Sequence, residues 1–155
     1  MTPSGRAAAR LWLPAALLAG LALRLWNLAS LRHSPFFARP VLDGQFCVDW
    51  ALQILAGSAP AAPFYQDPLY PYLLAGLFGI FGPGLWPVYL LHLALGLLVI
   101  ALVHDITRRL FGWRAAVIAA LIAATYKPFL FYEGQIEKTP VAVAAVTLAL
   151  WTLVR

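Results

Sequence analysis

The sequence has little of what soluble proteins depend on. Only 11% of its 155 residues are charged, and Cys47 is its single cysteine. One cysteine excludes an intrachain disulfide framework and a cluster of thiolate metal ligands. The eleven Lys and Arg residues are scattered between apolar runs and are not gathered on one face. This scarcity and scatter of charge exclude soluble enzyme folds, disordered chains and nucleic-acid-binding modules.

Apolar residues, in contrast, are abundant. Hydrophobic residues make up 63% of the chain, and the mean hydropathy is +0.81, far above the values of globular domains. The apolar runs have the lengths of membrane helices and are separated by short polar segments. The sequence therefore predicts an all-α, multi-pass membrane helical bundle. In such a protein the net charge of +5 reflects the orientation of the helices in the membrane. An anionic lipid is an alternative partner for this charge.

The first apolar segment covers residues 11–30, behind a short head that carries Arg6 and Arg10. This layout is typical of either a signal peptide or a first transmembrane helix. About 20 apolar residues suffice to cross roughly 30 Å of hydrocarbon. Because further membrane segments follow, the sequence favours an uncleaved span, with cleavage after Ala29 as the alternative.

Residues 31–84 are predicted to form an outer loop, because charged residues and prolines make its first half too polar for lipid. Within it, residues 44–56 carry an apolar stripe at spacing four, formed by Phe46, Trp50 and Ile54. Residues 68–82 are apolar but would make a helix of only about 22 Å. The loop is therefore expected to hold two juxtamembrane helices, the second re-entrant or lying on the surface.

Three further spans are predicted, at about 85–104, 115–131 and 140–154. If 68–82 does not span, six Lys or Arg residues lie inside and four outside, and the opposite choice inverts the count. The group Arg108, Arg109 and Arg114 in one short loop is the strongest orientation signal. We therefore expect four spans, a cytoplasmic N-terminus and a bacterial inner-membrane location. The last span ends at Arg155, so the chain is expected to be the N-terminal part of a larger transmembrane domain.

This topology brings most of the acidic residues to the outer side of the membrane. The polar residues that converge there are Asp43, Asp49, Asp67, Lys127, Glu133, Glu137 and Lys138. Carboxylates at a membrane boundary beside aromatic residues can act as general bases or metal ligands. The alternative is a solvated outer surface that simply carries charge.

Four stretches of the chain resemble one family. They are Leu42 to Phe46 with Trp50 and Ala51, Phe64 to Tyr72, Thr107 to Gly112, and Phe131 to Gly134 with Lys138. Together they resemble the N-terminal part of glycosyltransferase family 39, the GT-C membrane enzymes that include protein O-mannosyltransferases and the aminoarabinose transferase of lipid A. The resemblance extends from about Leu21 to Arg155.

The resemblance implies an enzyme with an active site on the outer membrane face. Such an enzyme takes a sugar from a polyprenyl-phosphate carrier and transfers it, with inversion, to a hydroxyl of a protein or lipid acceptor. No nucleic acid is expected as a partner, and a divalent metal is possible but not supported by the sequence. The alternative is a non-catalytic membrane subunit or a transporter fragment, in which the same carboxylates line a path or a subunit contact.

The resemblance also assigns roles to individual residues. Asp43 matches the catalytic carboxylate, where a base removes the proton of the acceptor hydroxyl; an Asp at this point is also a common helix N-cap. Gly44 departs from the family, in which a second acid often follows. The residues expected to bind substrate are Tyr65, Gln66, Asp67, Tyr70, Lys127, Glu133 and Lys138. Asp67 has a helix cap as its alternative role, and Lys127 or Arg24 would neutralise the carrier phosphate.

Overall fold

The computed structural model describes the backbone of residues 3–35, 37, 39–58 and 66–155, and the side chains within these ranges from Trp12 onward. All regular secondary structure in this described part is helical, which confirms the predicted all-α class. The helices are α1 (Pro3–Leu31), α2 (Asp43–Leu55), α3 (Leu69–Phe81), α4 (Trp86–Phe111), α5 (Trp113–Thr125), α6 (Lys127–Glu133) and α7 (Thr139–Val154).

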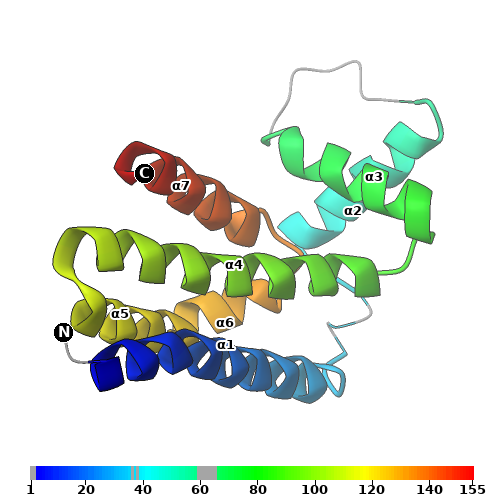
Figure 1. Ribbon diagram of the computed structural model, residues 1–155. Helices are drawn as coiled ribbons and strands as arrows, with labels where there is room; N and C mark the ends of the chain where they lie inside the picture. Colours follow the sequence, from blue (N-terminus) through cyan, green and yellow to red (C-terminus); the bar gives the residue numbers. More distant parts are fainter. Residues whose placement is uncertain (1–2, 36, 38, 59–65) are drawn as a thin grey trace.

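The long helix α4 is the centre of the bundle. It packs against α1, α5 and α7, while α1 also packs against α5. Helices α2 and α3 pack against each other beside the N-terminal end of α4, and both chain termini lie at the other end of the bundle (Figure 1). The molecule therefore has two distinct ends, one with the termini and the α4–α5 turn and one with α2, α3 and the α6–α7 turn.

Two helices are long and apolar enough to cross a membrane, α1 over Trp12–Leu31 and α4 over its 26 residues. The pair α5 and α6 makes a third if its two helices count as one bent span. Helix α7 is apolar but has 16 residues, about 24 Å at 1.5 Å per residue, so the fourth predicted span stays a prediction. The chain is an integral membrane protein.

The span predicted for 115–131 stays a prediction, and its helix is interrupted. The chain leaves the helical conformation at Tyr126 (φ −67°, ψ 108°), and α6 continues at an angle of 46° to α5. The cause is Pro128 near the start of α6. Proline has no N–H to donate to the carbonyl four residues earlier, and its ring collides with that carbonyl. The break turns α6 and the segment behind it toward α1 and α4.

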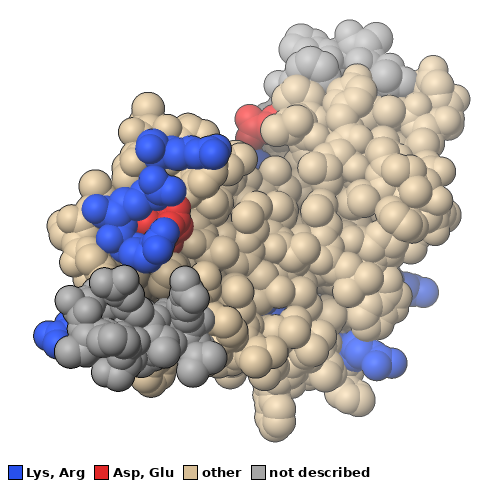
Figure 2. Space-filling view, in the orientation of Figure 1, with Lys and Arg blue, Asp and Glu red and all other residues tan. Residues whose placement is uncertain are grey.

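Helix α4 runs seven residues beyond the predicted end of the 85–104 span. It stops where Gly112 adopts a φ of 85°, a conformation that residues with a Cβ rarely adopt. Its last two turns carry Asp105, which binds Arg108 and Arg109. Basic side chains and an acidic one gather at the end where the termini lie (Figure 2). This basic end is the one predicted to face the cytoplasm.

Both short helices predicted for the outer loop are present, α2 and α3, each within one residue of the expected bounds. They bury a common core against the start of α4 and the segment before α7. Its buried members include Cys47, Ala51, Tyr70, Leu74, Val88, Tyr89 and Ile136. This core determines where α2 begins, and it therefore positions the side chain of Asp43.

Candidate active site

Asp43 is exposed at the first residue of α2. The N-cap of this helix is Leu42, so Asp43 is not the cap; in the first turn its carboxylate still interacts favourably with the helix dipole. Leu42 has a φ of 54°, a conformation that costs a side chain with a Cβ about 1–2 kcal/mol. Strain of this kind persists where surrounding contacts hold the backbone, and it is common at functional sites.

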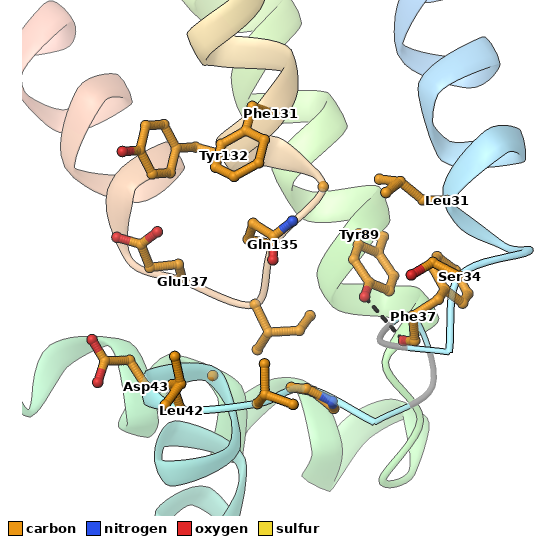
Figure 3. A pocket seen from close by; sticks show the side chains of 15 residues that line it. Leu31, Ser34, Phe37, Leu42, Asp43, Tyr89, Phe131, Tyr132, Gln135 and Glu137 are labelled. Carbon is orange, nitrogen blue, oxygen red and sulfur yellow. Dashed lines mark hydrogen bonds between the residues drawn. The ribbon is translucent and has the colours of Figure 1, made fainter.

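One hollow opens on one side of Asp43, with a volume of about 460 Å³. We call it the aromatic hollow. It is lined by Leu31, Ser34, Phe37, Pro40, Val41, Leu42, Asp43, Gly44, Tyr89, Phe131, Tyr132, Gly134, Gln135, Ile136 and Glu137. The rings of Phe37 and Tyr89 stack at 4.5 Å, and the Tyr89 hydroxyl donates to the Phe37 carbonyl at 3.1 Å (Figure 3). Asp43 and Glu137 lie on the same side of this hollow (Figure 3).

A second hollow, of about 560 Å³, also borders Asp43. This polar hollow is lined by Asp43, Cys47, Gln66, Asp67, Pro68, Ile136, Glu137 and Lys138. Asp43, Ile136 and Glu137 line both hollows. Two carboxylates, those of Asp43 and Glu137, therefore border both hollows.

Lys138 and Asp67 form an ion pair in the polar hollow, joining the start of α7 to the segment before α3. The N-cap of α3 is Pro68, so Asp67 does not cap that helix. The Asp67 carboxylate accepts a hydrogen bond from the Lys138 ammonium and raises the pKa of Lys138. Lys138 is therefore protonated at neutral pH and is paired with Asp67, in a hollow that Asp43 and Glu137 also line.

Cys47 and Gln66 line the polar hollow and contact each other. The thiol is 6% exposed, and its Sγ lies 3.8 Å from Gln66 Oε1. Burial, and then the negative charge of Asp43, raise the pKa of Cys47 to about 11. The thiol is therefore protonated at neutral pH and is a weak nucleophile.

Tyr70 points into the protein and lines neither hollow. It is 2% exposed, and its hydroxyl lies 3.2 Å from His92 Nε2. His92 Nδ1 lies 3.3 Å from the Glu133 carbonyl. Because a carbonyl only accepts, Nδ1 carries the proton and Nε2 accepts from the Tyr70 hydroxyl. Burial raises the pKa of Tyr70, so this hydroxyl stays protonated and joins α3 to α4.

Glu133 and Lys127, two more of the predicted site residues, line neither of these two hollows. The carboxylate of Glu133 is buried and pairs with Arg24 of α1, so neither charge is free for a carrier phosphate. Lys127 is exposed at the start of α6 and lines neither hollow. Tyr65 lies outside the described residues. Of the predicted set, the structure brings together Asp43, Gln66, Asp67 and Lys138.

Two residues that the sequence analysis did not assign to substrate binding also line the hollows, Gln135 and Glu137. They flank Ile136, which is buried at 5% exposure. Glu137 is among the carboxylates that the sequence placed on the outer side, whereas no sequence pattern marks Gln135. Among the described residues, no group of three or more His, Cys, Asp or Glu side chains is arranged to hold a metal ion.

A helical membrane bundle with an exposed carboxylate between two hollows is a membrane protein with an enzyme-like site at one end. The sequence model of the dolichyl-phosphate-mannose-protein mannosyltransferase family matches residues 61–155. The chain belongs to this family of GT-C membrane glycosyltransferases, and the resemblance inferred from its motifs is confirmed. No curated protein and no solved structure matches the chain. The match begins after Asp43, so the role of this residue depends on the geometry of the site.

Proposed function

We propose that the chain carries the active site of a membrane glycosyltransferase that moves a sugar from a polyprenyl-phosphate carrier to a hydroxyl of a protein or lipid. Asp43 is the general base. The observation that carries this proposal is the position of Asp43 between the two hollows, with Lys138 in one of them.

In the proposed reaction, Asp43 takes the proton of the acceptor hydroxyl as its oxygen attacks the anomeric carbon. The attack comes from the face opposite the carrier phosphate, so the new glycosidic bond forms with inversion. The bond between the anomeric carbon and the phosphate oxygen breaks, and polyprenyl phosphate leaves with the electron pair. A positioned base of this kind contributes about 10²–10⁴-fold to the rate.

The two hollows suit different ligands. The polar hollow contains Lys138, and a cation beside a departing phosphate stabilises its developing charge. Asp67 positions this cation, and Gln66 lines the same hollow. The aromatic hollow offers apolar surface with a few polar groups, which is typical of sites for small organic ligands. We place the carrier phosphate in the polar hollow and the acceptor in the aromatic one.

We further propose that the site faces the outside of a bacterial inner membrane and that the N-terminus is cytoplasmic. The arginines of the basic end support this orientation, since Lys and Arg favour the cytoplasmic side. Lys127 is proposed to contact the carrier outside the hollows, and Tyr65 is proposed to bind substrate. Tyr70 is proposed to act through its buried contact with His92, and Glu133 through the turn that follows it.

The test is the variant Asp43→Asn, with release of polyprenyl phosphate from polyprenyl-phosphate-linked hexoses and pentoses as the readout. We expect at least about a hundredfold loss of turnover. The matched control is Asp49→Asn on the same helix, because Asp49 is exposed, bonded to Gln45 and outside both hollows. Equal turnover of Asp43→Asn and the parent chain would refute the role. A chain that binds the donor but never turns it over would favour the non-catalytic subunit.

A further inference from the structure

An ion pair is buried between α1 and the end of α6. Arg24 Nε lies 2.7 Å from Glu133 Oε2, and Arg24 Nη2 donates to Glu133 Oε1 at 2.8 Å. The two side chains are only 3% and 9% exposed. Arg24 Nη1 donates to the Gly20 carbonyl at 3.2 Å. The guanidinium therefore makes one hydrogen bond to the carboxylate and one to its own helix, and its Nε contacts the carboxylate as an ion pair without a hydrogen bond.

Helix α4 contacts this ion pair at Gly96. A Cβ on residue 96 would lie 2.3 Å from Glu133 Oε1 and 2.6 Å from Arg24 Nε. Real Cβ atoms do not approach other atoms so closely, so only glycine leaves room for the pair at this point of α4. Helices α1, α4 and α6 thus pack closely around the two charged side chains.

The same end of α6 is held by two more polar contacts. Asn27 Nδ2, one turn beyond Arg24, donates to the Leu130 carbonyl at 2.8 Å. His92, one turn before Gly96, lies against the Glu133 carbonyl. The last carbonyls of a helix lack partners within the helix, so these contacts from α1 and α4 satisfy groups that would otherwise be left unpaired.

The turn that follows α6 carries the residues of the candidate active site. Gln135, Ile136 and Glu137 line the aromatic hollow, and Glu137 and Lys138 line the polar one. Burying two charges costs free energy that an apolar pair would not, so such a pair is weak evidence for stability alone. We propose that Arg24 and Glu133 are a positioning pair, which holds the turn 134–138 at the two hollows beside Asp43. The link to catalysis rests on the proposed function.

The accessibility of the Cys47 thiol depends on the position of this turn. Cys47 shares a buried cluster with Ile136 and is shielded from solvent. If the turn moves away, the thiol becomes accessible. The rate at which a maleimide labels Cys47 therefore measures the placement of the turn without any need for activity.

The variants are Arg24→Gln, Glu133→Gln and the double exchange Arg24→Glu with Glu133→Arg, each checked for helical circular dichroism. We expect both single variants to label about tenfold faster, the effect of one lost buried hydrogen bond to a charge. The double exchange should return the rate toward that of the parent chain. Gly96→Ala keeps both charges but places a methyl group against them, so Cys47 should also be labelled faster in this variant. If a charge variant does not fold, Gly96→Ala still tests the proposal.

The matched control is Arg108→Gln, which breaks an ion pair that is 57% exposed on its Arg side and should leave Cys47 labelling unchanged. Parent-like labelling of Arg24→Gln, Glu133→Gln and Gly96→Ala would overturn the proposal. In the transfer assay, a positioning role lowers kcat more than it raises KM, and the double exchange rescues kcat.

The labelling experiment tests the positioning role, and the transfer assay of Asp43→Asn tests the proposed function, so each proposal can be refuted independently of the other. If Asp43→Asn abolishes transfer while labelling is unchanged in the Arg24 and Glu133 variants, the positioning role is wrong and the proposed function stands. If Asp43→Asn has no effect on transfer, the proposed function is wrong. A tenfold rise in labelling would in that case still support the pair as the support of the turn.

Discussion

The backbone of Gly44 lies directly against that of Ile136. A Cβ on residue 44 would come within 2.9 Å of the Ile136 carbonyl oxygen. This contact joins the start of α2 to the turn before α7 and brings Glu137 to the same hollows as Asp43. A glycine at this position thus has a steric reason, because a larger residue would separate Asp43 from the turn.

We predict that Gly44→Ala destabilises the fold and lowers transfer. The added methyl meets a backbone atom that cannot move aside as a side chain would, and overpacking of this kind costs about 1–3 kcal/mol. The measurement is the free energy of unfolding in detergent, followed by helical circular dichroism. The matched control is Gly76→Ala on α3, where a Cβ meets nothing within 4 Å, and where alanine should stabilise the helix by about 0.5–1 kcal/mol. Equal effects of the two substitutions would contradict the steric explanation.

A second prediction concerns the alkaline limit of the reaction. Asp67 raises the pKa of Lys138 above its ordinary value, so the stabilising contribution of the pair is fully present below that ordinary value. The contribution is lost as the pH rises through the raised pKa. In Asp67→Asn the ammonium should lose its proton at lower pH, and the alkaline fall of transfer should move to lower pH with it. An unchanged alkaline limb would show that the charge of Lys138 does not matter to the reaction.

Cys47 should react slowly with maleimides in the parent chain. Its pKa of about 11, against an ordinary value of 9.0, implies about a hundredfold less thiolate at neutral pH than a free cysteine has. The labelling rate should rise with pH up to that value. Labelling as fast as that of a small thiol would place Cys47 on the surface and contradict the burial of α2 against α3.

The orientation in the membrane is best read at exposed positions of a Cys47→Ala chain. Leu42→Cys lies beside Asp43 at a position that is 86% exposed, and Phe111→Cys lies at the basic end at a position that is 74% exposed. We expect an impermeant maleimide added to intact spheroplasts to label the first and not the second. The reverse pattern would place Asp43 on the cytoplasmic side and rule out the proposed outer-face reaction.

Tyr70→Phe should separate a supporting role from a substrate contact. The substitution leaves His92 Nε2 without its donor, and an unsatisfied buried group costs about 1–3 kcal/mol. Tyr72→Phe, on the exposed face of the same helix, is the control and should change stability by less than about 0.5 kcal/mol. A rise of the KM for the donor with unchanged stability would instead indicate that Tyr70 contacts the substrate.

The long helices of this protein were predictable because each is an apolar run of characteristic length. The positions of α2 and α3 followed from the same reasoning, to within one residue. The break at Tyr126 was missed because apolar residues continue on both sides of Pro128, so hydropathy does not register the bend. Arg24 was a signal for the buried pair, because a charge within an apolar helix requires a partner, but six acidic residues were available.

The sequence by itself determined the membrane class, the all-helical architecture and the gathering of polar residues at one end, because these depend on hydropathy and its periods. Only the tertiary structure decided which of those polar residues line the hollows and which are buried in ion pairs. It pairs Glu133 with Arg24 in the interior, leaves Lys138 with Asp67 in the polar hollow and places Asp43 between two hollows. The physical reason is that pairing depends on distances between atoms far apart in the chain, which the bend at Pro128 and the close approaches at Gly44 and Gly96 establish.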